Sequence, residues 1–467
     1  MHSSLSEEDA RTSHTARSPS PSGEGRGEGL SHTGSINLAL VLLFLIPRLA
    51  LLFAREPFFD ELFTRWMSAG SFTGILGALH SDSGPPLYYF IIHLLGDPSV
   101  IVLRVFSLLC ACTMLALLLW ARRLGDARFW AAALLALYPP SVLLSIDARA
   151  YALCALLVAA GVLALDAGRP FAAAAAFLAA AYCHYYGILF FPLLLLKGKR
   201  GLAAAGLACA LFIPGFWLAA HQPVSAMAWN DLRPFVPLTS LSFAGRYASL
   251  LLNPPIALVI VSLVVLLAGV ARAWRFAPYV LIPAAIALAF AAFGRAVYFP
   301  ARFESVLAFP LMLWLGTSLV QWTRPLRLAI AAALLSIGAV VIAGGTMDHL
   351  HRPLEGCMAG ALFIRDHVAP RTPVVASAYC YLYATSVLGS RVEAFPREQA
   401  LHPGWWRPME AAEESGALRD LPRGEFVWLG EVVLPERRLL ERNRRLLGAV
   451  HVDGGTVLLR VGPITLH

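Results

Sequence analysis

Long apolar runs recur between residues 36 and 345, and they constrain this chain more than any other feature of its sequence. Only 14% of the 467 residues are charged and 58% are hydrophobic, whereas soluble globular proteins carry about 25% charged residues. A soluble chain of this length would need two or three domains, each with a charged surface. The chain has too few charges for that, so we conclude that it is an integral membrane protein.

The apolar runs predict a polytopic, mainly α-helical protein. A helix that crosses a bilayer needs about 20 apolar residues, or fewer where it is short or irregular. We predict eleven transmembrane helices, with 171–197 interpreted as two short helices. The candidate spans are 36–54, 99–120, 129–146, 150–166, 171–184, 187–197, 201–220, 255–271, 278–293, 305–321 and 328–345.

The net charge of +8 follows a membrane topology. Residues 36–345 hold 20 Lys or Arg against 10 Asp or Glu, whereas residues 346–467 are balanced. With eleven spans and a cytoplasmic N-terminus, every basic cluster at a span end falls on the cytoplasmic side, as the positive-inside rule requires. This distribution accounts for the charge without a nucleic-acid partner, and we exclude nucleic-acid binding. The clusters are Arg122, Arg123 and Arg128; Arg169; Lys197, Lys199 and Arg200; Arg272 and Arg275; and Arg324 and Arg327.

The same topology divides the rest of the chain. Residues 1–35 form a disordered cytoplasmic tail, because their polar composition cannot offset the entropy of ordering. The loops 55–98 and 221–254 lie outside, and apolar spacing in the first predicts one or two helices along the membrane surface, interrupted near Gly70 and Gly74.

Residues 346–467 are predicted to form an extracytoplasmic soluble α/β domain. We expect strands at 374–377 and 426–429 and a hairpin turn at 453–455. Cys357 and Cys380 lie in this domain, and the sequence leaves open whether they form a disulfide or stay as two thiols.

Two polar groups in the first outer loop are candidates for chemistry. Asp60 and Glu61 follow the first span directly, and adjacent carboxylates at a lipid boundary are costly unless they are paired, solvated or bound to a cation. The next group is His80 and Asp82, held on a turn by Gly84 and two prolines ahead of a helix. An ordinary solvated loop and an interfacial aromatic belt are the alternative explanations.

Five elements in order resemble the GT-C glycosyltransferases, in particular the branch with protein O-mannosyltransferases and the aminoarabinose transferase of lipid A. The resemblance covers roughly residues 36–345, and each element is weak alone. The elements are Asp60-Glu61; an Asp-x-x-Pro-Pro-Leu-Tyr-Tyr stretch from Asp82 to Tyr89; Asp147-Ala148-Arg149-Ala150-Tyr151; His184-Tyr185-Tyr186-Gly187; and Arg302-Phe303 with Pro310 beyond.

The resemblance implies transfer of a sugar from a polyprenyl-phosphate carrier to an acceptor lipid, glycan or protein outside the membrane. By its place in the motif, Asp60 is the expected base of an inverting reaction, and Glu61 is expected to support it, orient the acceptor or bind a cation. Arg149 and Arg302 are expected to face the leaving phosphate, with interfacial snorkelling as the alternative. Further candidates for substrate binding are His80, Asp82, Tyr88, Tyr151, His184 and Tyr185.

Several points stay open at this level. His80, Asp82 and Glu61 could hold a divalent cation, but no spacing amounts to a metal signature. A buried histidine such as His184 is more often structural than a ligand. The alternative function is a transporter or flippase of a lipid-linked saccharide, which should carry its charges at mid-membrane on broken helices. The resemblance places the protein in the bacterial inner membrane, with the site and the C-terminal domain facing the periplasm or exterior.

Overall fold

The computed structural model of the chain describes residues 26–54, 56–80, 82–222, 273–292, 302–351, 356–395, 397, 418, 421–431, 440, 442, 444–452 and 456–462. The predicted span 255–271, the predicted turn 453–455 and all but the first two residues of the predicted loop 221–254 lie outside these residues.

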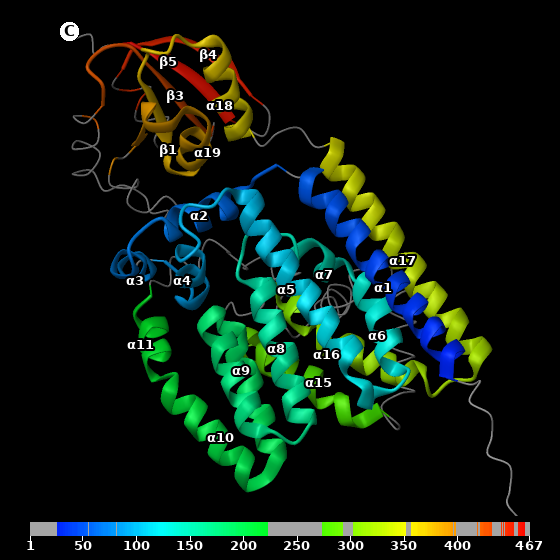
Figure 1. Ribbon diagram of the computed structural model, residues 1–467. Coiled ribbons are helices and arrows are strands. Elements are labelled where there is room, and N and C mark those ends of the chain that lie inside the picture. The colour runs from blue at the N-terminus through cyan, green and yellow to red at the C-terminus, as the bar shows by residue number, and fades with distance from the viewer. Residues whose placement is uncertain are drawn as a thin grey trace, which may run out of the picture. The chain divides into compact units, whose positions relative to one another are not determined.

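In the part of the chain up to residue 367 that the structure describes, the regular elements are helices (Figure 1). In chain order they are α1 (Arg26–Ala54), α2 (Phe59–Ser68), α3 (Phe72–His80), α4 (Leu87–His93), α5 (Val100–Trp120), η1 (Arg122–Leu124), α6 (Ala127–Ala136), α7 (Pro139–Leu144), α8 (Tyr151–Asp166), α9 (Pro170–Cys183), η2 (Tyr185–Lys197), α10 (Gly198–Leu211), α11 (Ile213–His221), η3 (Trp274–Phe276), α15 (Pro278–Ala292), α16 (Arg302–Leu319), α17 (Arg324–His351) and α18 (Gly356–His367).

Three of the described helices are long and apolar enough to cross a bilayer by themselves. These segments are Gly34–Ala54, Val100–Trp120 and Arg324–Gly344, and a bent pair from Tyr185 to His221 adds a fourth if it is counted as one span. Four other apolar helices are shorter than a full crossing. The mainly helical membrane architecture is confirmed, whereas the number of eleven spans stays a prediction.

Prolines break two of the predicted spans. The predicted helix 129–146 is divided into α6 and α7, because Pro139 and Pro140 at the start of α7 lack the amide hydrogens that would continue α6. The predicted helix 201–220 is divided into α10 and α11, and the stretch Tyr185–Leu211 that ends with α10 meets α11 at an angle of 47° just before Pro214. At the N-terminus the structure differs again, because residues 26–35 of the expected disordered tail are helical and extend the first span.

The segment 55–98, predicted to be an outer loop, folds into the short helices α2, α3 and α4. The first two correspond to the one or two helices expected from the apolar spacing, and α4 to the helix expected after the two prolines. Gly70 lies in the break between α2 and α3, as expected, but Gly74 lies inside α3. Helix α4 begins at Leu87 with Pro86 as its N-cap, which confirms the helix start expected after the Gly-Pro-Pro turn.

Helix α8 separates two groups of charged residues. Its last residue, Asp166, pairs with Arg123 of η1 at 3.2 Å and with Arg275 of η3 at 2.7 Å. Three segments that we predicted to share the cytoplasmic side therefore meet at one end of α8. The first residue of α8 is Tyr151, which belongs to the candidate site, and sixteen residues of helix place it roughly 24 Å from Asp166.

A fully buried arginine fixes α1 to later helices. The guanidinium of Arg48 donates hydrogen bonds to the carbonyl of Ala136 at 2.9 Å and to the hydroxyls of Ser141 and Ser145 at 3.2 and 3.0 Å. These bonds satisfy the charge within the helical packing and also supply donors to the end of α6, where carbonyls have no partner in their own helix.

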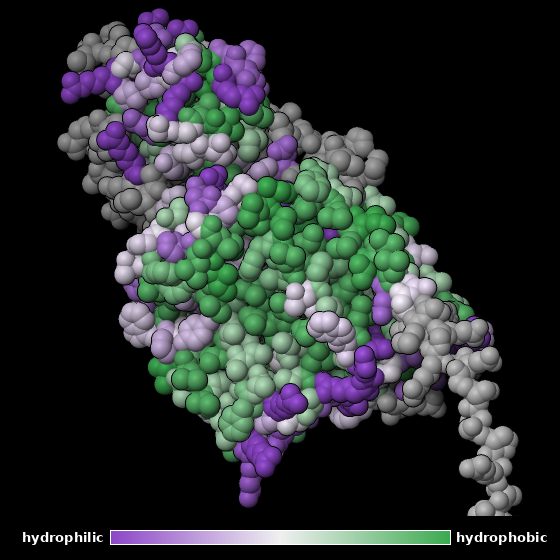
Figure 2. Space-filling view, in the orientation of Figure 1, coloured by the Kyte–Doolittle hydropathy of each residue, from purple (hydrophilic) through white to green (hydrophobic). Residues whose placement is uncertain are grey.

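The outside of the helical part is apolar. Large hydrophobic side chains such as Leu42 of α1, Leu109 of α5 and Leu202 of α10 are about half exposed or more. Figure 2 shows hydrophobic residues covering a broad face of these helices, with hydrophilic residues gathered at the lower end of that face. A surface of this kind is costly in water and suits the hydrocarbon of a bilayer.

The C-terminal residues form a five-stranded mixed sheet with helices, as the sequence predicted. Strand order is β2-β1-β3-β5-β4; β1 runs parallel to β2 and β3, whereas β5 runs antiparallel to β3 and β4. The predicted strands correspond to β1 and β3. The elements are β1 (Val374–Ser377), α19 (Ala378–Leu388), η4 (Gly389–Arg391), β2 (Val392–Phe395), β3 (Phe426–Glu431), β4 (Leu446–His451) and β5 (Thr456–Val461).

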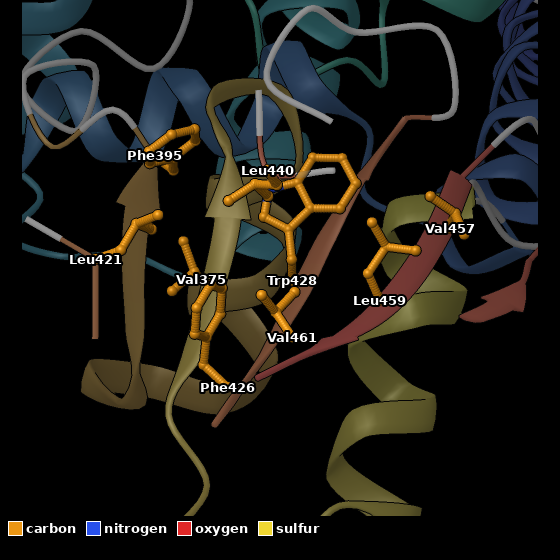
Figure 3. Packing of buried hydrophobic residues seen from close by; sticks show 9 residues of the cluster. All are labelled: Val375, Phe395, Leu421, Phe426, Trp428, Leu440, Val457, Leu459 and Val461. Atoms are coloured by element: carbon orange, nitrogen blue, oxygen red, sulfur yellow. The ribbon is translucent and has the colours of Figure 1, made fainter. Parts of the chain in front are cut away.

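Trp428 of β3 lies at the centre of the core of this sheet, surrounded by Val375, Leu440 and Leu459 (Figure 3). On the other side of the strand, Gly360 of α18 approaches Leu429 so closely that a Cβ atom would lie 2.5 Å from its side chain. Cys357 and Cys380 form a disulfide between α18 and α19, which answers the question that the sequence left open.

Candidate active site

The carboxylate of Asp60 lies between two arginines from distant parts of the chain. Asp60 is in the first turn of α2, and its Oδ2 accepts a hydrogen bond from Nη2 of Arg302 at 3.0 Å. Nε of Arg149 is 3.9 Å from the same oxygen. All three side chains are partly exposed, so the group is reachable from outside the packed helices. The structure brings together the three residues for which the sequence predicted the central chemistry.

Glu61 faces the opposite way, into the protein. Its carboxylate is fully buried and binds Arg104 of α5 through two hydrogen bonds, Nε to Oε1 at 2.8 Å and Nη2 to Oε2 at 2.6 Å. Oε1 also accepts a hydrogen bond from the backbone amide of Ala148 at 3.0 Å. Because Ala148 precedes Arg149 and Glu61 follows Asp60, this carboxylate fixes the spacing between the segments that carry Asp60 and Arg149.

Arg104 is not among the site residues that the sequence predicted. Its charge inside the apolar run 99–120 was the available signal, since an arginine there is costly unless it has a partner. In the structure its guanidinium also donates to the backbone carbonyls of Leu52 and Glu56, at 3.2 and 2.9 Å. Glu61 and Arg104 therefore form a buried ion pair that positions the start of α2, and each neutralises the charge of the other.

A group of aromatic rings borders the other side of Arg302. Its guanidinium carbon lies 5.7 Å from the centre of the Tyr151 ring. The His184 ring lies 5.3 Å from Tyr151 and 4.3 Å from Tyr186, and its Nδ1 accepts a hydrogen bond from the Tyr186 amide at 3.2 Å. His184 thus has a structural role, because it caps the start of η2, and its place beside Tyr151 keeps substrate binding a prediction.

Asp82 lies in the turn between α3 and α4, and its charge acts on the same group. Burial raises the pKa of this carboxyl from 3.8 to about 6; Arg149 opposes the shift and Asp60 adds to it. Tyr89 of α4 is also within the electrostatic reach of Arg149 and Asp60. Tyr88, which the sequence favoured, is buried against Tyr89 and Phe106, and the charge of Arg149 acts on it as well, so both tyrosines stay candidates for the site.

Two predicted site residues lie outside the immediate group. His80, at the end of α3, stacks on the rings of Trp217 and His221 at 6.1 and 6.3 Å between ring centres. The hydroxyl of Tyr185 donates to Oε1 of Gln222 at 2.9 Å. The sequence left open whether His80, Asp82 and Glu61 hold a cation; in the structure Glu61 binds Arg104 and His80 packs on α11, so the three side chains are not brought together.

Within the described ranges no three His, Cys, Asp or Glu side chains form a group that could hold a metal ion. The site described above is therefore built from one exposed carboxylate, two arginines, a partly buried acid and aromatic rings. Such a set offers a proton acceptor beside fixed positive charge.

The raised pKa of Asp82 predicts how stability depends on pH. The folded protein holds this proton more tightly than the unfolded chain does, so stability falls as pH rises from about 4 to about 6 and stays lower above that. Asp82→Asn should remove this slope and raise stability at pH 7 by at most roughly 3 kcal/mol, from about two pKa units. Thermal unfolding in detergent between pH 4 and 8 measures the effect.

Asp97 supplies the control for Asp82. Hydrogen bonds from Arg65 lower the pKa of this exposed carboxyl. Its contribution to stability is therefore lost as pH falls, whereas the contribution of Asp82 is lost as pH rises. Asp97→Asn should therefore leave the slope between pH 4 and 6 in place or steepen it. An Asp82→Asn variant with the wild-type slope would contradict the assignment of the shifted group.

The arrangement of helices is the fold that the resemblance of the five sequence elements predicted, because it superposes on that of ArnT, a solved membrane protein. ArnT from Cupriavidus metallidurans superposes in its apo state with a TM-score of 0.55 and 14% sequence identity, covering 92% of this chain and 98% of that one. The structure of ArnT bound to undecaprenyl phosphate gives the same TM-score and identity, over 93% and 98%. At this identity the likeness extends to the fold alone.

Other comparisons add little. The mycobacterial arabinofuranosyltransferase AftD superposes with a TM-score of 0.44 and 15% identity over 91% of this chain and 40% of its own length, a score too low to carry a conclusion. No protein-family model matches the sequence, and no curated protein matches it.

Proposed function

We propose that this protein is an integral-membrane glycosyltransferase that moves a sugar from a polyprenyl-phosphate donor to an acceptor outside the cytoplasmic membrane. The observation that carries the proposal is the carboxylate of Asp60, held 3.0 Å from Arg302 and 3.9 Å from Arg149 at one end of α8. The shared fold with ArnT, which was solved with undecaprenyl phosphate bound, supports a polyprenyl-phosphate partner.

Asp60 is the proton acceptor in this mechanism. The acceptor's hydroxyl oxygen attacks the anomeric carbon of the donor sugar while the bond from that carbon to the phosphate oxygen breaks. The hydroxyl proton passes to the carboxylate of Asp60, and both electrons of the broken bond leave with the polyprenyl phosphate. Such a base contributes about 10²- to 10⁴-fold to the rate when it is within hydrogen-bond reach of the hydroxyl.

Arg302 and Arg149 stabilise the phosphate. A polyprenyl-phosphate sugar is a phosphodiester, and its phosphate gains a second negative charge as the sugar leaves. Fixed cations beside that group act mainly in the transition state, where the charge develops. Because Arg302 binds Asp60 before substrate arrives, a bound phosphate that draws Arg302 away would also free the carboxylate to accept a proton.

The position of the charges favours an enzyme over the alternative, a transporter or flippase. A transporter should place ionisable groups near mid-membrane, whereas Asp60, Arg149 and Arg302 lie at the end of α8 that is opposite Asp166. The disulfide between Cys357 and Cys380 supports a site that faces the oxidising side of the membrane.

The direct test is a transfer assay in membranes that contain the protein. A panel of radiolabelled sugars linked to undecaprenyl phosphate is added to these membranes. We expect label to move from at least one donor to an extracytoplasmic lipid, glycan or protein, and to stay with the donor in membranes without the protein. Reconstituted vesicles test the alternative. Movement of lipid-linked sugar across the bilayer with no transfer from any donor would favour the flippase.

A further inference from the structure

The carboxamide of Gln222 joins two segments of the candidate site. Gln222 is the C-cap of α11 and is buried. Its Nε2 donates to the carbonyls of Leu79 and Gly84, both at 2.8 Å, and its Oε1 accepts from the Gly84 amide at 3.2 Å and the Tyr185 hydroxyl at 2.9 Å. A glutamine amide has two donor hydrogens and two acceptor lone pairs, so all four positions are used.

These bonds hold both ends of the turn that carries Asp82. Leu79 is in the last turn of α3, Gly84 lies just before the two prolines, and Asp82 is between them. Gly84 adopts φ 118°, in the left-handed region that favours glycine. Among the described residues, a backbone bond from the Asp82 amide to the Leu79 carbonyl at 3.3 Å also crosses the turn.

The fourth bond reaches the segment after α9. Tyr185 follows His184, whose ring lies beside Tyr151 and so beside Arg302. Gln222 is distant in sequence from both segments, 138 residues from Gly84 and 37 residues from Tyr185. Its carboxamide therefore links the Asp82 turn to the segment that carries His184.

We propose that Gln222 is a positioning residue of the transfer site: its carboxamide sets the Asp82 turn against the His184–Tyr185 segment, and so places both beside Arg149 and Arg302. The role in catalysis rests on the proposed glycosyltransferase function. The placement of the Asp82 turn is independent of that function. The structural role and the catalytic role of Gln222 are therefore measured separately.

The placement is tested by cysteine labelling. In a Cys209→Ser background, which removes the exposed thiol, Ser83→Cys reports on the half-buried turn. The Gln222→Ala variant lacks the carboxamide, so the turn should open more often and expose the thiol. We expect its reaction with a membrane-impermeant maleimide to be about tenfold faster, the effect of losing roughly two net hydrogen bonds. Gln321→Ala is the matched control, because Gln321 is an exposed glutamine beyond α16.

The catalytic half is tested with the sugar-transfer assay on chains without the added cysteine. Gln222→Ala and the isosteric Gln222→Glu should both lower transfer about 10- to 100-fold through kcat. Gln222→Glu keeps the shape but turns oxygen toward the two carbonyls that now accept hydrogen bonds. Binding of undecaprenyl phosphate, by contrast, should change by less than about threefold.

Each result decides one part of the proposal. Unchanged labelling in Gln222→Ala would overturn the positioning role. Faster labelling with transfer at the wild-type rate would show that the position of the turn does not matter for catalysis. Absence of transfer by the wild-type protein from every donor would remove the proposed function itself, and the labelling result would still stand.

Discussion

Asp60→Asn is expected to lower sugar transfer by about 10²- to 10⁴-fold, the contribution of a well-placed general base. The amide keeps the size of the side chain but cannot accept the proton of the acceptor hydroxyl. It also removes the negative charge that now holds Arg302 at 3.0 Å. Binding of undecaprenyl phosphate should therefore be equal to that of the wild type or tighter, measured by competition with a radiolabelled analogue.

The control for this experiment is Asp126→Asn, an exposed carboxyl near η1, at the other end of the helices from the candidate site. It should transfer at the wild-type rate. Transfer by Asp60→Asn within about threefold of wild type would remove Asp60 from the role of base. Loss of both sugar transfer and undecaprenyl-phosphate binding would instead point to misfolding of the site.

Arg104→Ala is expected to destabilise the protein by about 3–5 kcal/mol, because it leaves the carboxylate of Glu61 buried without its partner. The start of α2 would lose the two bonds that hold it to α5, and Asp60 would lose its fixed distance from Arg149. We therefore expect loss of transfer together with a lower unfolding temperature in detergent.

Two further variants show whether the loss of stability comes from an unpaired buried charge or from the loss of an ion pair as such. Arg65→Ala breaks an exposed ion pair with Asp97 and should cost no more than about 1 kcal/mol. The double variant Glu61→Gln with Arg104→Met removes both charges and should recover much of the stability lost in Arg104→Ala, without recovering transfer. An Arg104→Ala protein as stable as Arg65→Ala would show that Glu61 is not held by this pair.

The sequence predicted those features of the site that depend on residue type and order along the chain. Asp60, Arg149 and Arg302 were identified because each lies in a short motif next to an apolar run, and a shared membrane face follows from topology. Arg104 and Gln222 were missed, because their partners are 43 and up to 143 residues away and only the folded chain shows which carboxylate or carbonyl each one meets.

The fold was predictable to a similar extent. Apolar runs located the helices, since burial in lipid depends on composition, but α6 and α7 form two helices where one was predicted. The proline pair at 139–140 lies within an apolar stretch, and hydrophobicity alone gives no sign that the helix ends there. In the C-terminal domain, β1 was found at its observed bounds because a short β-branched run with flanking turns is a strong local signal.

The partners of Arg48 have a consequence for biosynthesis. This arginine lies within the first apolar helix, and apart from the carbonyl of Phe44 its hydrogen-bond partners come from residues 135–145, which are synthesised almost a hundred residues later. At about 5–20 residues per second, the interval is roughly 5–20 s. During that time the helix cannot be released into lipid without exposing a charge to hydrocarbon. We therefore expect the first span to stay in the insertion machinery until the serines and carbonyls that follow it emerge from the ribosome.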